Sequence, residues 1–440
     1  MKKEFLRISI FAGLIFLAVF SAQGQIGRRF PSEKKVITDP VTGVKLTFLT
    51  STPHGDSKMY QTHNQWTADG KWIIFKSDRV KGEAMAVNEQ SGVIVQITEG
   101  GYASMLCVAR KSMKLYFLRK PIGQPESKSV EVVEVDLEKL FNDSESNTLK
   151  PALVYQRVCG TTPAEWDVES DMALDGSEDW VWFRVGKKEA IKHLSAGTKL
   201  EESFGPRHLG AGPGGIGGMN IHTGEMKYVV SVPFQVGHIQ TNPWVSGQIF
   251  FCWETGGKAP QRTWFINSDG SGLAPLYKES EYEWITHETV ISPDEVAFII
   301  SGHRRVKEID GKQVMDESDW GPFGTREKPT GLAVINLKTH EVSLEGQVAE
   351  GNGFWHATGS PDKRFLAGDH PSRSVYAINR KTHEMIMLTT GHKQTAIDHL
   401  HPTFSPDGTR LEIQTAMLSA DDKTMNICIV PLPERWLKQK

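Results

Sequence analysis

Cysteine is scarce in this 440-residue chain, and its spacing excludes several kinds of site. The four cysteines, Cys107, Cys159, Cys252 and Cys428, lie far apart, and no C-x-x-C pair occurs. Zinc ribbons, dithiol redox motifs and disulfide frameworks need cysteines that are closely spaced or more numerous. Because each cysteine lies in or beside an apolar run, we expect four free thiols, most of them buried as small apolar side chains.

An excess of positive charge is absent as well. Lysine and arginine total 50 against 53 aspartates and glutamates, which gives a net charge of -3 and no support for nucleic-acid binding. No G-x-S-x-G sequence is present, so a serine hydrolase with a nucleophile elbow is excluded. With 39% hydrophobic and 23% charged residues, the chain is an ordinary globular protein with room for one very large domain or two or three smaller ones.

Long apolar runs are missing beyond residue 20. The single run spans residues 8–20, follows a start that bears lysine and arginine, and precedes the small residues Ala22 and Gly24. This pattern is typical of a secretory signal peptide rather than of a membrane span. We therefore expect residues 1–24 to be removed, and residues 25–440 to form an exported protein of the periplasm or the extracellular medium, without a membrane partner.

Helical periodicity is not convincing anywhere, whereas one polar turn recurs ahead of strand-like runs. The clearest copies are TADGKWIIF from Thr67, ALDGSEDWVWF from Ala173, SPDEVAFII from Ser292, SPDKRFLAG from Ser360 and SPDGTRLEI from Ser405. Two weaker copies, from Val108 and Trp244, fill the gaps and bring the number to seven. A second piece with the pattern of a hairpin follows each turn, often with T-G or T-H at its bend.

The repeat predicts an all-β fold, a seven-bladed β-propeller with four-stranded blades over residues 25–440. The last copy lacks its returning strand, and residues 44–50, VKLTFLT, are expected to supply it and to close the ring from the N-terminal end. Three longer intervals between turns predict inserted loops: 111–175, 175–247 and 294–362. One insert contains a G-x-G-x-x-G from Gly210, but a strand follows it instead of a helix, which argues against a dinucleotide site.

Six of the 15 histidines come shortly before these turns. They are His63, His238, His287, His356, His399 and His401. If the strand before each turn lines the central channel, its first residues open onto one face of the disc. We therefore expect these histidines to converge at one mouth of the channel from five blades.

The H-x-H pair in HLHP is the most specific part of this set. A strand places His399 and His401 on the same face, and His287 comes from a nearby blade. Three neutral imidazoles suit a divalent transition metal such as Mn, Fe, Co, Ni or Zn better than calcium or magnesium. Taken singly, His63 and His356 are more simply interpreted as hydrogen-bonded surface or channel residues.

At these residues the chain resembles a known family, the oligogalacturonate lyases, which are seven-bladed propellers that act on short pectin fragments. The resemblance is carried by GH-x4-PW (237–244), TWFINSDG (263–270), ITHETVISPD (285–294) and HLHPTFSPDG (399–408). It implies Mn²⁺ held by His287, His399 and His401, and His238 as the Brønsted base. The reaction it implies is β-elimination in a short, acidic, uronate-containing oligosaccharide.

The chain departs from the family pattern at two positions. The family has a glutamine ligand three residues before the histidine pair, where this chain has Ala396; Gln394, Asp398 or water would replace it. The family also has a catalytic arginine where this chain reads GPGGIGGMN, so Arg262 or Arg207 would assist the substrate carboxylate or the leaving group.

Alternatives to this function remain open. A lyase for another uronate linkage, such as rhamnosyl-glucuronate, would keep most of the site and change the loops. A non-catalytic propeller that scaffolds periplasmic complexes would share the turns but would not need clustered histidines. Tryptophans near the site would either stack on sugar rings or fill the spaces between blades, the commoner use; they are Trp66, Trp244, Trp264, Trp284 and Trp355.

Overall fold

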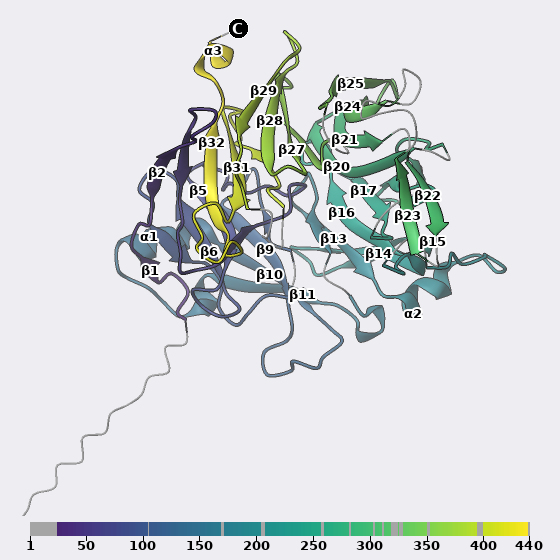
Figure 1. Ribbon diagram of the computed structural model, residues 1–440. Helices are drawn as coiled ribbons and strands as arrows, with labels where there is room; N and C mark the ends of the chain where they lie inside the picture. The colour runs from purple at the N-terminus through teal and green to yellow at the C-terminus, as the bar shows by residue number, and fades with distance from the viewer. Residues whose placement is uncertain are drawn as a thin grey trace, which may run out of the picture.

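The computed structural model describes residues 24–438 except 104, 169–170, 204–206, 257–258, 281–282, 302–303, 310–311, 318–323, 325–328, 350–352 and 394–398; for 304–309 and 312–317 it describes the backbone alone. Within this part the protein is a seven-bladed β-propeller, as the repeat predicts. Figure 1 shows the blades around the ring, with the last strands of the chain beside β2 and β5 of its N-terminal part.

Every blade is an antiparallel sheet, and in blades 2 to 6 the first strand in chain order is the inner one. Blade 1 contains β4 (Asp56–Lys58), β5 (Trp72–Ser77), β6 (Ala84–Asn88) and β7 (Ile94–Gln96), with β1 (Arg29–Phe30) at its outer edge. Blade 2 contains β8 (Cys107–Val108), β9 (Lys114–Arg119), β10 (Glu131–Asp136) and β11 (Gln156–Thr161). Blade 3 contains β12 (Met172–Leu174), β13 (Trp180–Val185), β14 (Ala211–Asn220) and β15 (Met226–Phe234).

The same order continues through the next three blades. Blade 4 contains β16 (Val236–Thr241), β17 (Gln248–Trp253), β18 (Thr263–Asn267) and β19 (Ala274–Pro275). Blade 5 contains β20 (Trp284–Ser292), β21 (Glu295–Ser301), β24 (Thr330–Asn336) and β25 (Val342–Gly346), and the hairpin of β22 (Arg304–Ile309) and β23 (Lys312–Glu317) is inserted in it. Blade 6 contains β26 (His356–Gly359), β27 (Phe365–His370), β28 (Ser374–Asn379) and β29 (Glu384–Thr389).

Blade 7 joins the two ends of the chain. It contains β30 (Thr403–Phe404), β31 (Arg410–Thr415) and β32 (Asn426–Pro431), then β3 (Lys45–Phe48) and β2 (Lys35–Thr38) from the N-terminal part. The strand β3 lies antiparallel to β32, with Thr47 opposite Ile429 and Phe48 opposite Cys428. The predicted closure by residues 44–50 is therefore confirmed.

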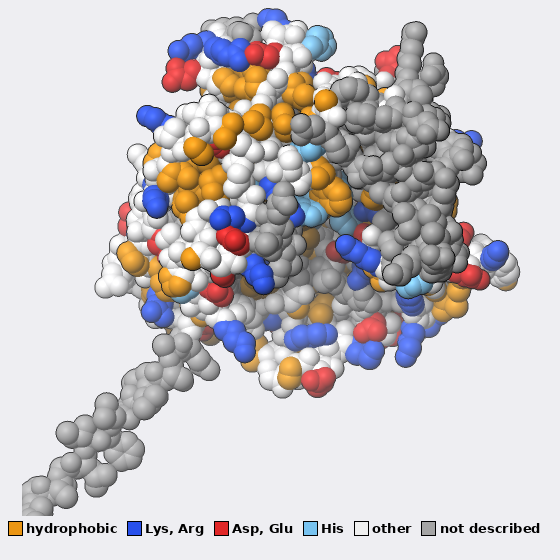
Figure 2. Space-filling view, viewed as in Figure 1, with side chains coloured by type: hydrophobic (Ala, Val, Ile, Leu, Met, Phe, Trp, Pro, Cys, Tyr) orange, Lys and Arg blue, Asp and Glu red, His pale blue; other side chains and the backbone are white. Residues whose placement is uncertain are grey.

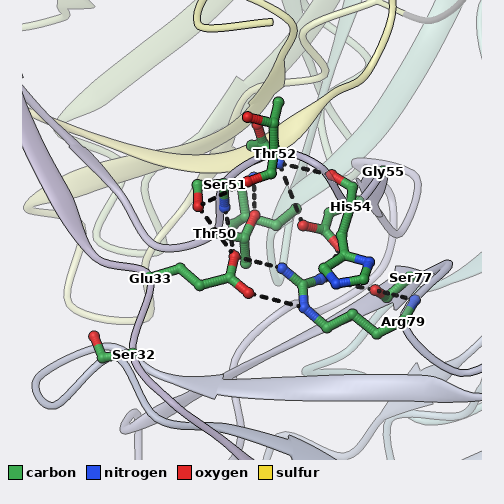
Figure 3. Close-up of polar contacts among 12 residues, drawn as sticks. Ser32, Glu33, Thr50, Ser51, Thr52, His54, Gly55, Ser77 and Arg79 are labelled. Carbon is green, nitrogen blue, oxygen red and sulfur yellow. Dashed lines mark hydrogen bonds and ion pairs between the residues drawn. The ribbon is translucent and has the colours of Figure 1, made fainter.

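A buried ion cluster stabilises this junction (Figure 3). The Arg79 guanidinium, 1% exposed, pairs with the carboxylates of Asp56 and Glu33, and its Nη2 lies 2.6 Å from Glu33 Oε2. That Glu33 oxygen also accepts the backbone N–H of Ser51 at 2.7 Å. We call Glu33, Asp56 and Arg79 the closure cluster, because it joins the N-terminal segment to blade 1 and to the loop that follows β3.

The recurrent turns owe their shape to a side-chain hydrogen bond. In SPDG the Ser405 hydroxyl donates to Asp407 Oδ1 at 2.6 Å, and Ser360 and Asp362 repeat this contact at the same distance. The fourth residue of the turn has a positive φ, 69° at Gly408 and 63° at Lys363. This left-handed conformation explains the frequent glycine at that position.

The hydrophobic core is divided among the interfaces between blades. The described residues form seven buried apolar clusters, one at each junction between neighbouring blades. Trp66, which is 0% exposed, belongs to the junction of blades 7 and 1. All four cysteines are free thiols, and all except the half-buried Cys159 are buried, as predicted.

The expectation of no helix was wrong in one place. The third strand of blade 2 does not return as a hairpin but runs into α1 (Leu137–Glu145), whose first turn is capped by Asp136 Oδ1, which accepts from the Lys139 N–H at 3.0 Å. The other α-helices are single turns, α2 (Lys187–Ala190) and α3 (Glu434–Leu437). Single 3₁₀ turns occupy Ala152–Val154, Ala164–Trp166 and Ile191–His193.

Among the described residues, no helix is both long enough and apolar enough to cross a membrane. The predicted signal peptide, residues 1–24, lies outside the described residues except for Gly24.

Candidate functional site

Four histidines from three blades meet at one end of the channel. They are His287 in β20, His356 at the start of β26, and His399 and His401 just before β30. The ring centroid of His356 lies 4.2 Å from those of His287 and His401 and 5.2 Å from that of His399. We call these four residues the histidine cluster. Two of the three ligands predicted from the sequence, His399 and His401, thus meet with His356, and the third, His287, contacts the ring of His356.

The backbone at the site adopts a conformation that is uncommon for residues with a side chain. His238, His287 and His401 have φ angles of 51°, 54° and 48°. At His238 and His287 the register between the inner strand and the next strand shifts, as at a β-bulge. Such left-handed residues cost of order 1–3 kcal/mol each and gather at functional sites.

Burial keeps two imidazoles of the cluster, those of His287 and His356, neutral. His356 and His401 are buried, whereas His287 and His399 are half-buried and so remain open on one side. Burial, reinforced by the neighbouring imidazole, holds the pKa of His287 and of His356 well below the usual value of 6.5. Neutral imidazole is the form that binds transition metals.

One buried nitrogen in the cluster has no partner. Nδ1 of His287 is shielded from solvent and lacks a hydrogen-bond partner among the described residues. Ligand nitrogens of His356, His399 and His401 all lie within 4.8 Å of one another. Three converging nitrogens, and an orphaned one on a ring that contacts His356, fit the donor set of a transition-metal site, so these residues could hold the metal that the sequence predicts.

The predicted base His238 lies beside this cluster and is held by a carboxylate. Its Nε2 lies 2.9 Å from Glu254 Oε2, and Arg262 Nη2 lies 3.7 Å from the same oxygen. Burial lowers the pKa of His238, but the hydrogen bond and charge of Glu254 outweigh burial and raise it. Glu254 was not predicted from the sequence. Arg262 is 3% exposed, so the structure places this predicted site residue behind the base and not at the surface.

Tyr60 lies between the predicted base and the histidine cluster. Its ring makes edge contacts with His238 at 5.0 Å, with His401 at 5.1 Å and with His356 at 6.0 Å between centroids. The hydroxyl is buried and has no partner among the described residues. Tyr60 was not predicted either, because nothing in the sequence around it marks it as a site residue.

Two predicted site residues are not joined to the cluster by described contacts. Arg207 is exposed and lies over Gly256 in the loop after β17. Gln394, the proposed replacement for the family glutamine, lies outside the described residues, as do Ala396 and Asp398.

His63 does not join the cluster, contrary to the expectation that all six histidines share one mouth. It lines a cavity of about 90 Å³ with Thr241, the last residue of β16, and with Trp244 beyond that strand, which mark the opposite end of the channel. A turn in which the His63 N–H donates to the Tyr60 carbonyl at 3.0 Å interrupts the inner strand of blade 1. Because this turn shifts the residues of blade 1 along the channel, the Tyr60 side chain lies where other blades have a histidine.

One opening lies at the cluster, and a second lies on blade 1. A pocket of about 170 Å³ is lined by Trp355, Asp369, His370, Pro371, Arg373 and His399. A groove of about 520 Å³ with Lys76, Lys81 and Tyr102 lies at the same end of blade 1, where the inner strand begins. In Figure 2, histidine side chains are visible near the middle of the face, with lysine and arginine around them.

Of the tryptophans for which sugar stacking was left open beside packing between blades, Trp355 lies at the pocket, with its ring 4.9 Å from His399 and 5.9 Å from His287. Trp66 is a core residue, and Trp244 lies under the Arg110 guanidinium, 4.4 Å away, at the opposite mouth.

Comparisons of the whole chain with known proteins found similarity in three dimensions. An oligogalacturonate lyase solved in complex with manganese is 17% identical, with a TM-score of 0.71 over 94% of this chain and 100% of that one. An oligogalacturonate lyase from Vibrio parahaemolyticus is 18% identical, with a TM-score of 0.68 over the same shares. No family model and no curated protein sequence matches the chain. At this level of identity the likeness shows the seven-bladed propeller fold.

Proposed function

We propose that the protein is a metal-dependent lyase that cleaves short uronate-containing oligosaccharides of the pectic type by β-elimination. The observation that carries this proposal is the histidine cluster, in which imidazoles from three blades converge and one buried nitrogen lacks a partner. A non-catalytic scaffold has no need of such a cluster beside a carboxylate-held histidine. The likeness to oligogalacturonate lyases, one of them bound to manganese, supports the same function.

The elimination needs a neutralised carboxylate, a base and help for the leaving group. A divalent metal such as Mn²⁺, held by His287, His399 and His401, would act as a Lewis acid on the uronate carboxylate and so acidify the C5 proton. The chain itself supplies the base, His238. Because the Glu254 carboxylate accepts from Nε2, the neutral imidazole has its lone pair at Nδ1, which is the atom assigned to receive the C5 proton.

Cationic side chains around the mouth fit an acidic substrate. Arg373 and Trp355 line the pocket beside His399, which offers a guanidinium and an aromatic face to one uronate unit. Lys76 and Lys81 line the groove on blade 1, at the same end of the channel. Arg262 lies too deep to meet a sugar directly in this arrangement, and we assign it to holding Glu254, while Arg207 stays a surface candidate for leaving-group assistance.

The reaction itself is the test. Elimination creates a double bond between C4 and C5 conjugated to the carboxylate, which absorbs in the ultraviolet, whereas hydrolysis creates none. We expect an absorbance rise when the metal-loaded protein is incubated with oligogalacturonates. Rhamnosyl-glucuronate oligosaccharides serve as the comparison linkage. His238→Ala should abolish the rise and keep the metal. A silent panel with metal bound would overturn the proposal and favour a scaffold.

We also propose that the protein is exported, on the basis of its first 24 residues. N-terminal sequencing of protein recovered from the native host should give a start near Gln25. Recovery of an intact Met1 would contradict export.

A further inference from the structure

His356 occupies the centre of the histidine cluster. It is 1% exposed, and its ring is the one that approaches all three of the others within 5.2 Å. Its ligand nitrogen lies within 4.8 Å of those of His399 and His401. Nitrogens bound tetrahedrally to one zinc ion at 2.0–2.1 Å lie about 3.3 Å apart, so a small inward movement would bring these atoms onto one ion.

Asp369 fixes the tautomer of His356. The two residues face each other across β26 and β27, and Nδ1 of His356 lies 3.0 and 3.1 Å from the two carboxylate oxygens. Because a carboxylate only accepts, Nδ1 must carry the proton and Nε2 the lone pair. The same carboxylate accepts the backbone N–H groups of His356 at 2.8 Å and of His401 at 3.3 Å. This carboxylate–histidine arrangement is the usual support of a metal-binding imidazole.

Buried histidines elsewhere in the chain show the contrast. His63 uses both ring nitrogens, with Thr62 Oγ1 at 2.9 Å and the Met172 carbonyl at 2.8 Å. His392 uses both as well, with the hydroxyls of Thr415 at 2.7 Å and Thr389 at 3.2 Å. Among the described residues, His356 has a hydrogen-bond partner at Nδ1 alone.

We infer that His356 is a fourth imidazole ligand of the metal site, supported by Asp369, and that the four-imidazole set selects cobalt, nickel or zinc over manganese. The inference rests on the metal site of the proposed function and adds to it a ligand and a metal preference. A fourth imidazole also explains how the site can dispense with the glutamine that this chain lacks at Ala396. Imidazole nitrogen suits the later transition metals, whereas manganese prefers oxygen ligands.

The first test needs no variant. X-ray absorption spectroscopy of the full chain loaded with zinc should give four imidazole nitrogens at 2.0–2.1 Å. Competition titrations against a fluorescent chelator should show tighter binding of Co²⁺ than of Mn²⁺, by a factor on the order of 100 or more. A spectrum with three imidazoles would remove His356 from the ligand set, and equal affinities for the two ions would overturn the selectivity.

Variants then assign the fourth nitrogen. His356→Phe should weaken Co²⁺ binding by more than about 100-fold and Mn²⁺ binding by less, while Asp369→Asn should weaken Co²⁺ binding by about 10- to 100-fold. The matched control is His63→Gln, a buried histidine outside the cluster, which should bind as the wild type does. Wild-type Co²⁺ affinity and absorption spectrum in folded His356→Phe would overturn the inference.

The same titrations separate this inference from the proposed function. If His401→Ala loses the metal while His356→Phe keeps wild-type affinity, the lyase site stands and the fourth ligand falls. If the wild type binds no transition metal, the metal step of the proposed function falls as well.

Discussion

The closure cluster and the histidine cluster are both buried groups of polar side chains, but they differ in how their atoms are satisfied. In the closure cluster, the Arg79 cation has two carboxylate partners, and no buried side-chain atom of its three residues lacks a partner. In the histidine cluster, Nδ1 of His287 has no partner, and the next residue, Glu288, has both carboxylate oxygens buried and unpartnered among the described residues.

The difference separates structural burial from burial for a ligand. A buried polar atom without a partner costs about 1–3 kcal/mol, so a fold keeps such atoms only when something else repays the cost. The closure cluster is complete in the chain alone and joins its N-terminal segment to blade 1. The histidine cluster is incomplete in the chain alone, and a bound metal would complete it. Breaking each cluster in turn should therefore have opposite consequences for stability and for metal binding.

The largest effect on stability is expected at the closure cluster. Arg79→Ala leaves the buried Asp56 carboxylate without its cation, which should lower the free energy of unfolding by about 3–5 kcal/mol. Denaturant titration measures the loss. Metal affinity of the folded variant should stay at the wild-type value. The matched control is Lys438→Ala, which removes an exposed pair with Glu434 and should change stability by less than about 0.5 kcal/mol. Equal losses in the two variants would contradict the structural role of the closure cluster.

The next largest effect is that acid should destabilise the protein through buried histidines whose two ring nitrogens both have hydrogen-bond partners. Burial lowers the pKa of His392 to about 4, so the unfolded chain binds its proton first as the pH falls below about 6.5. Stability is therefore complete above that pH and declines down to about pH 4, by up to about 3 kcal/mol for this group. His392→Gln should have a shallower dependence of unfolding free energy on pH in this window. Parallel curves for variant and wild type would exclude His392 as a cause.

Metal should stabilise the protein through the histidine cluster alone. Free Co²⁺ at 100 times its dissociation constant should raise the free energy of unfolding of the wild type by about 2.7 kcal/mol. His401→Ala should lose this gain, whereas Arg79→Ala should keep it on its lower baseline. Thermal or denaturant unfolding with and without the metal measures both. If Co²⁺ still raised the free energy of unfolding of His401→Ala, the ion would bind outside the histidine cluster.

The smallest effect concerns the base. Glu254 raises the pKa of His238, so Glu254→Gln should lower that pKa and move the acid limb of kcat to lower pH. The rate above the limb should also fall, because the imidazole loses its carboxylate support. Metal affinity should not change. If the acid limb did not move, Glu254 would not control the ionisation of the base.

The fold was predictable because its signals are local. The polar turn recurs in seven copies, two of them weak, hairpin bends follow most of these turns, and the unpaired last strand pointed to residues 44–50. The helix α1 was missed because its nine residues follow directly on a strand and give only two turns of periodicity. The register shift that removes His63 from the mouth was missed because it depends on one turn at residues 60–63.

The site was only partly predictable because its contacts cross blades. The H-x-H spacing marked His399 and His401, and repetition along the chain marked His287 and His238. His356 was interpreted as an ordinary channel residue, since nothing near it in the sequence shows that Asp369 fixes its ring. Glu254 and Tyr60 carry no local signal, because their roles follow from which inner strands face each other in the closed ring.

The most direct test of the contrast between the two clusters is an anomalous diffraction map of crystals loaded with a transition metal. The account predicts one strong peak within bonding distance of His287, His356, His399 and His401, and none beside Glu33, Asp56 and Arg79. A fully loaded crystal without a peak at the histidine cluster would contradict it.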